Sequence, residues 1–100
     1  MRILIVEDEV KIREGMGKII RSLTGHMIVG EASDGEEALE MVLRFNPDLI
    51  ITDIRMPKMD GLEMARRLRE QNIPVHVVIL TGYSEFEYAK KAIHYGVDDY

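Results

Sequence analysis

The chain has 100 residues, a formal net charge of −5, no cysteine and a hydrophobic content of 46%. This length suits one short domain with a modest core, and the lack of thiols excludes a disulfide framework, thiolate metal sites and thiol nucleophiles. The acidic balance argues against direct nucleic-acid binding, and no apolar run approaches the roughly 18 residues of a membrane span. The absence of cysteine favours a reducing compartment, so we expect a cytoplasmic protein.

The first third of the chain alternates between a strand pattern and a helix pattern. Residues 2–6 (RILIV) form a continuous β-branched run, typical of a strand that is buried on both faces. Apolar side chains then recur at helical spacing over residues 12–23, and Gly25 is a helix stop. Residues 27–32 (MIVGEA) predict the second strand.

The SDGE segment that follows is typical of a capping box, with Ser33 and Glu36 as its two partners. The helix that it begins would place four apolar residues on its inner face and end near Pro47: Ala38, Leu39, Val42 and Leu43. The same alternation continues with a strand over 48–53, a helix begun by Asp60 and Glu63, a strand over 75–80 and a helix from Ser84 to Gly96.

Strands that alternate with helices predict right-handed βαβ crossovers and a doubly wound parallel sheet with helices on both faces. We expect the flavodoxin-like strand order 2-1-3-4-5, in which the first and third strands are neighbours at the point where the strand order reverses. The last residues, VDDY, are typical of the start of a fifth strand.

Ligands of open parallel sheets bind beyond the carboxyl ends of the strands. The first strand delivers Glu7 and Asp8 to this edge, the third delivers Asp53, and the fourth delivers Thr81. Three carboxylates in one place repel one another unless a cation joins them, and a hard divalent ion such as Mg²⁺ suits oxygen ligands. Asp53 could then serve as the nucleophile of an aspartyl phosphate.

Each of these residues also has an ordinary structural explanation. An Asp after a strand is usually a turn or cap residue, acids often occupy the first helical turn, and Thr81 precedes Gly82 as turn formers do. Only the arrival of all of them at one sheet edge favours a functional site. The chain has no GxxxxGK[ST] or GxGxxG loop, so a bound nucleotide is not indicated.

The segments ILIVEDE, ITDIRMPKMDG and VVILTGYSEFEYAKKAIHYGVDDY resemble the receiver domain of two-component response regulators, over the whole chain and in the same order. The LTGYSEFEYAKKAI segment is most similar to receivers joined to an AraC-type helix-turn-helix output domain. The resemblance implies that Asp53 accepts phosphate from a sensor histidine kinase, that Thr81 is the switch hydroxyl and that Tyr100 is the switch aromatic. It also implies a set of Mg²⁺ ligands: Asp8, Asp53, the backbone carbonyl of Arg55, and Glu7 through a water molecule.

Two features depart from the family pattern. Many receivers carry Asp where this chain has Glu7, and receivers continue after the switch aromatic with a lysine, a proline and a final helix, whereas this sequence ends at Tyr100. We therefore expect residues 1–100 to form a receiver domain with an incomplete fifth strand, no last helix and no output domain. Such a chain would expose apolar surface and an unpaired sheet edge, so we expect self-association, as a native homodimer or as a result of the truncation.

Three functions compete. The first is a signalling switch that catalyses only its own aspartyl phosphorylation and dephosphorylation and controls an output domain, typically for DNA-binding transcription regulation. The second is a small Mg²⁺-dependent phosphohydrolase with an aspartyl nucleophile, against which Arg55 stands where such enzymes often place an Asp. The third is an FMN binder, which the acidic VEDEVK turn disfavours.

Overall fold

The computed structural model describes residues 1–80. Strands and helices alternate along this part: β1 (Arg2–Val6), α1 (Val10–Arg21), β2 (Met27–Ala32), α2 (Gly35–Phe45), β3 (Leu49–Thr52), α3 (Gly61–Glu70) and β4 (His76–Ile79). The helix predicted from Ser84, the fifth strand, Thr81 and Tyr100 all lie outside the described residues.

The four strands form one parallel sheet in the order β2-β1-β3-β4, which confirms the order predicted for them. The register aligns the carboxyl ends of the central strands, because Val6 of β1 pairs with Thr52 of β3. The ladder continues past the strand end, where the amide of Asp53 donates to the carbonyl of Val6 over 3.1 Å. The residues that follow β1 and β3 are therefore neighbours at one edge of the sheet.

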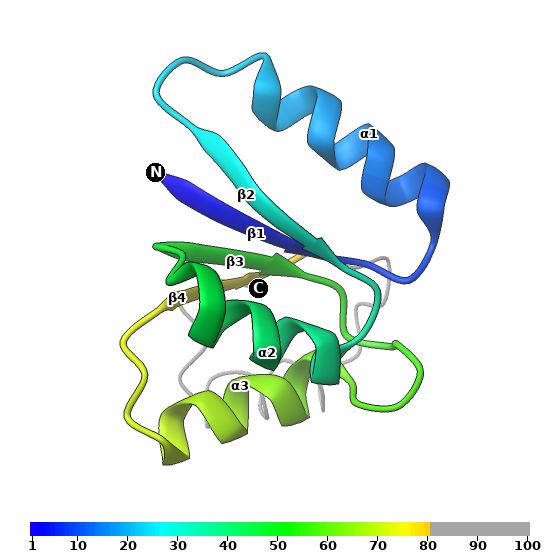
Figure 1. The fold of residues 1–100 in the computed structure, drawn as a ribbon. Helices are drawn as coiled ribbons and strands as arrows, with labels where there is room; N and C mark the ends of the chain where they lie inside the picture. The colour runs from blue at the N-terminus through cyan, green and yellow to red at the C-terminus, as the bar shows by residue number, and fades with distance from the viewer. Residues whose placement is uncertain (81–100) are drawn as a thin grey trace.

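Helices cover both faces of this sheet (Figure 1), with α1 on one side and α2 and α3 side by side on the other. Side chains of β1 alternate between the two faces, as a pleated strand requires. Ile3 and Ile5 are buried with Ile20 of α1, while Leu4 and Val6 join the larger core that α2 and α3 complete. Burial on both faces explains the uninterrupted apolar run of β1.

The helix starts confirm one predicted cap and correct another. Asp60 caps α3, since its side chain accepts from the amide of Glu63 as predicted. In α2 the cap is Asp34, whose carboxylate accepts from the amide of Glu37 over 2.9 Å, so the prediction of a Ser33–Glu36 box is wrong. Ser33 donates instead to the Glu37 carboxylate, because the helix begins one residue later than the motif suggests.

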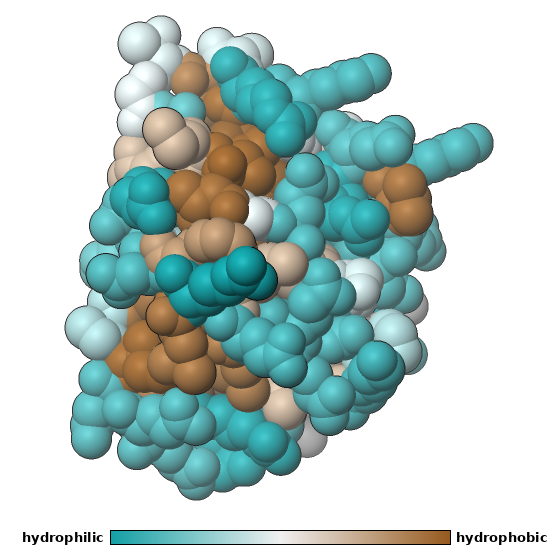
Figure 2. All heavy atoms as spheres, in the orientation of Figure 1, coloured by the Kyte–Doolittle hydropathy of each residue, from teal (hydrophilic) through white to brown (hydrophobic). Residues whose placement is uncertain are grey.

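The predicted inner face of α2 is also partly wrong. Ala38 and Val42 are buried, but Leu43 is 73% exposed and lies on the solvent side of the helix. Apolar residues of the α1 region are exposed as well, among them Ile12, Ile19 and Leu23. Figure 2 shows brown side chains at the surface over β2 and the neighbouring end of α1. Within residues 1–80, no helix is both long enough and apolar enough to cross a membrane.

The arginine-rich face of α3 is occupied by ion pairs within the helix. Arg66 pairs with Glu63 and Glu70, and Arg67 pairs with Glu63. These contacts place Arg66 and Arg67 among acids of the same helix, whereas Arg69 donates to the backbone carbonyls of Ile73 and Val75.

Candidate functional site

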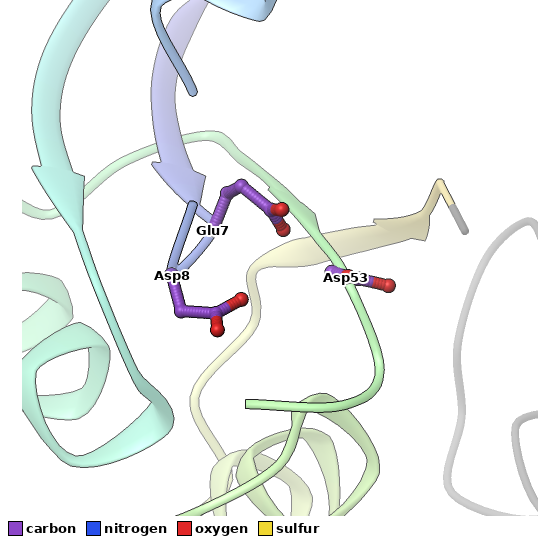
Figure 3. Close-up of side chains that lie close together, drawn as sticks. All are labelled: Glu7, Asp8 and Asp53. Carbon is purple, nitrogen blue, oxygen red and sulfur yellow. The ribbon is translucent and has the colours of Figure 1, made fainter. Parts of the chain in front are cut away.

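Three carboxylates meet beyond the carboxyl ends of β1 and β3. Figure 3 shows Glu7 and Asp8 leaving the end of β1 beside Asp53, which follows β3. One carboxylate oxygen from each residue lies within 4.8 Å of the corresponding oxygen of the other two. The structure thus brings together residues that are more than forty positions apart in the chain.

Hydrogen bonds position the backbone of Glu7 and Asp53 and orient the Asp53 carboxylate. The amide of Asp53 is tied to the carbonyl of Val6, and the amide of Ile54 donates to Asp53 Oδ1 over 2.7 Å. On the β1 side, the guanidinium of Arg13 donates to the carbonyl of Glu7 over 2.7 Å. Arg13 also lies 3.6 Å from the carboxylate of Glu31 on β2, so α1 and β2 together hold the turn that carries Glu7.

The three acids differ in their access to water. Glu7 is only 2% exposed, Asp53 is half-buried and Asp8 is exposed. The pKa of Glu7 is raised to about 7, mainly by burial and in smaller part by the charge of Asp53 and a hydrogen bond with it. The site therefore holds a buried carboxyl group that keeps its proton until near neutral pH, beside two acids that remain accessible.

This donor set fits a hard divalent cation. Carboxylate oxygens are the ligands that Mg²⁺ prefers, and Mg²⁺ usually takes one or two of them and keeps several waters. Asp8 and Asp53 offer such ligands at the accessible side of the cluster. A cation here would also relieve the repulsion among the three acids.

The loop after Asp53 begins with a close backbone approach. A Cβ on Gly61, the first residue of α3, would lie 2.2 Å from the carbonyl oxygen of Asp53, so only glycine fits. The amide of Gly61 donates to the carbonyl of Ile54, and the buried hydroxyl of Thr52 donates to the carbonyl of Asp53. These contacts close the loop into a compact turn that holds Asp53 at the sheet edge.

Of the other predicted site residues, Arg55 lies in the exposed loop two positions beyond Asp53. Two contributors to the site were missed. Arg13 holds the backbone of Glu7, and Gly35 at the start of α2 contacts the loop that follows Asp53. A glycine at the first position of a helix, where alanine is the better helix former, was the available indication for Gly35.

The parallel sheet, its strand order and the acids at its carboxyl edge place this chain in the class of doubly wound α/β domains, which bind their ligands at that edge. The family model of the response regulator receiver domain matches residues 3–100. The transcriptional regulatory protein YesN of Bacillus subtilis, a protein called uncharacterized, is 41% identical over 100 residues, which cover 99% of this chain and 27% of that protein. The chain thus belongs to the response regulator receiver domain family, whose members are signalling modules of two-component systems and not enzymes in the usual sense.

Solved structures agree with this assignment. A DNA-binding response regulator of the LuxR family from Staphylococcus aureus superimposes with a TM-score of 0.95 at 30% identity, covering 99% of this chain and 82% of that chain. The CheX–CheY–BeF₃–Mg²⁺ complex from Borrelia burgdorferi matches with a TM-score of 0.89 at 29% identity, covering 98% of this chain and 74% of that chain. The chain spans less than half of the length of the first curated relatives that it matches.

Proposed function

We propose that Asp53 is the phosphoacceptor of this receiver domain and that a sensor histidine kinase is the donor. The observation that carries the proposal is the cluster of Glu7, Asp8 and Asp53 within 4.8 Å, at the sheet edge of a chain that belongs to the receiver family. In the transfer, a carboxylate oxygen of Asp53 attacks the phosphorus atom, a P–O bond forms, and the P–N bond to the donor imidazole breaks with its electron pair passing to nitrogen.

The proposed cofactor is Mg²⁺, and the Mg²⁺ of the matched CheX–CheY complex supports it. Asp8 and Asp53 would bind it directly with the backbone carbonyl of Arg55, and Glu7 would act through a water molecule. When bound, the ion supplies positive charge that neutralises the transferring phosphoryl oxygens. The chain's own part is to orient Asp53 through the amide of Ile54 and to hold the backbone of Glu7 through Arg13.

The remaining assignments follow from the resemblance. We propose Thr81 as the switch hydroxyl and Tyr100 as the switch aromatic, both outside the described residues. We also propose that residues 1–100 act in the cytoplasm as a receiver joined, in the full protein, to a DNA-binding output domain of the AraC type. The regulatory names of several relatives support this role in transcription.

The decisive experiment incubates the 100-residue chain with Mg²⁺ and a small phosphodonor and locates the added mass by peptide mapping. We expect one phosphoryl group on Asp53, which is lost in Asp53→Asn and retained in Asp48→Asn, an exposed aspartate at the opposite end of β3. Labelling that persists in Asp53→Asn would contradict the proposal. Rapid multiple turnover of assorted phosphate esters would instead favour the phosphohydrolase.

A further inference from the structure

The loop that follows Asp53 contacts the N-terminus of α2 near the loop's end. The amide of Gly35 donates to the carbonyl of Met59 over 2.9 Å. A Cβ built on Gly35 would lie 2.7 Å from that carbonyl oxygen and 2.8 Å from Met59 Cγ. No real side chain tolerates such distances, so any residue larger than glycine must displace the loop or the helix.

Gly35 is not required by its own backbone conformation. Among the described glycines only Gly25 has a positive φ, and Gly35 is the first residue of a helix, where alanine is the better helix former. The reason for a glycine here is thus the approach of Met59.

Met59 cannot easily move away from Gly35. Its side chain is 6% exposed and belongs to the large core, together with Ala38 of α2. The preceding Lys58 has a left-handed φ of 65°, and the amide of Met59 donates to the carbonyl of Pro57, so the backbone turns sharply just before the contact. The loop is fixed by its buried end.

The contact bears directly on the proposed site. The segment 55–58 lies between two residues that are held in place. Ile54 is fully buried and its carbonyl accepts a hydrogen bond from the amide of Gly61, and the carbonyl of Met59 accepts one from the amide of Gly35. Arg55, whose carbonyl is a proposed Mg²⁺ ligand, lies in this segment. The position of that carbonyl relative to Asp8 therefore depends on both anchors.

An ion pair between Lys58 and Asp34 also joins the loop to the start of α2, but it contributes less than the backbone contact. Lys58 Nζ lies 4.0 Å from Asp34 Oδ2, and the lysine side chain is 67% exposed. Exposed pairs at this separation contribute little, because water screens the charges and the long side chain loses freedom. The backbone contact, not the ion pair, is the firm connection.

We propose that Gly35 is a positioning residue for the phosphorylation site: the N-terminus of α2 clamps the loop at Met59 and thereby sets the affinity of the site for Mg²⁺. This inference rests on the proposed magnesium site. Residues that orient metal ligands from outside typically change metal affinity by about 10–100-fold when mutated. We expect an effect at the lower end of this range from Gly35→Ala.

The first test needs no metal. Amide chemical shifts of the metal-free protein are compared between wild type, Gly35→Ala and Val42→Ala, a control that destabilises the same helix from its buried face, seven residues after Gly35. Gly35→Ala should shift the amides of Ile54, Arg55 and Met56, whereas Val42→Ala should leave them in place. Shifts confined to residues 34–38 and Met59 would overturn the clamp.

The second test measures Mg²⁺ dissociation constants by calorimetry at a temperature where all variants are folded. We expect binding about tenfold weaker in Gly35→Ala and within about twofold of wild type in Val42→Ala and Lys58→Ala. Equal binding by wild type and Gly35→Ala, or an equal loss in Val42→Ala, would contradict the clamp alone. A wild-type protein that binds no Mg²⁺ would contradict the proposed function, and the amide shifts would still decide whether Gly35 positions the loop.

Discussion

At the scale of single residues, Glu7 is the acid that most distinguishes this site. Its side chain is almost completely buried, although it carries a carboxyl group, and it lies against Asp53. Burial and the nearby acids both favour the protonated form, which raises its pKa from 4.5 to about 7. A folded state that binds a proton more tightly than the unfolded state loses stability as pH rises between these two values.

We therefore predict that Glu7→Gln changes how the stability of the metal-free protein depends on pH. Wild type should lose about 2 kcal/mol of unfolding free energy between pH 5 and pH 8 through Glu7, since each pKa unit is worth about 1.4 kcal/mol. The glutamine variant keeps the shape of the side chain without the charge and should lose less. Urea unfolding in a chelator at both pH values measures the difference.

The matched control is Glu14→Gln, an exposed acid on α1 that is not among the groups raising the pKa of Glu7. It should show the pH dependence of wild type. If Glu7→Gln and wild type weaken in parallel from pH 5 to pH 8, the proton is not held by Glu7.

At the scale of elements, the sequence was sufficient for the strands and for their order. Continuous apolar runs bounded by acids or prolines predict strands in the interior of a parallel sheet, and the two central strands of the described sheet, β1 and β3, are built from such runs. The start of α2 was misjudged because Ser33 and Asp34 are both good caps, and in the structure it is the Asp34 side chain that accepts from the first turn, next to the contact of Gly35 with Met59. Leu43 was misplaced because the buried face of α2 is narrower than the apolar pattern implies: Ala38 and Val42 are buried and Leu43 is exposed.

The corrected cap leads to a prediction. Asp34→Ala should lower the stability by about 1 kcal/mol, because the amide of Glu37 loses its acceptor at a position where water has little access. For a chain of this length that is a fall in Tm of about 4–8 °C. Ser33→Ala removes only a bond to the Glu37 side chain and should have a smaller effect. Thermal unfolding of the two variants distinguishes them, and a larger loss from Ser33→Ala would restore the original capping box.

At the scale of the whole molecule, the convergence of the acids could be foreseen because the strand order makes β1 and β3 neighbours. The depth at which Glu7 lies and the clamp at Gly35 could not, since both depend on contacts between segments whose separation the sequence does not specify. The sequence predicted self-association but did not indicate which surface would mediate it. Self-association was expected from an incomplete domain, and the described residues show where apolar surface is available.

That surface is the α1–β2 patch, which we define as Ile19, Leu23 and Met27. These residues are 67%, 52% and 61% exposed, and Figure 2 shows apolar side chains over this region. They lie beside β2, which is an edge strand of the described sheet, so apolar area and free backbone groups occur together. We predict that the 100-residue chain associates through this patch in a concentration-dependent manner.

Sedimentation velocity over a range of concentrations tests this prediction, with Ile19→Glu as the disrupting variant. Burying an isoleucine contributes about 1.5–3 kcal/mol, so its replacement by a charge should raise the dissociation constant at least about tenfold. Leu43→Glu is the matched control, because Leu43 is similarly exposed (73% against 67% for Ile19) but lies on α2, on the other face of the sheet. If both variants weaken association to the same extent, the association is non-specific. If neither does, the chain associates through residues outside the patch.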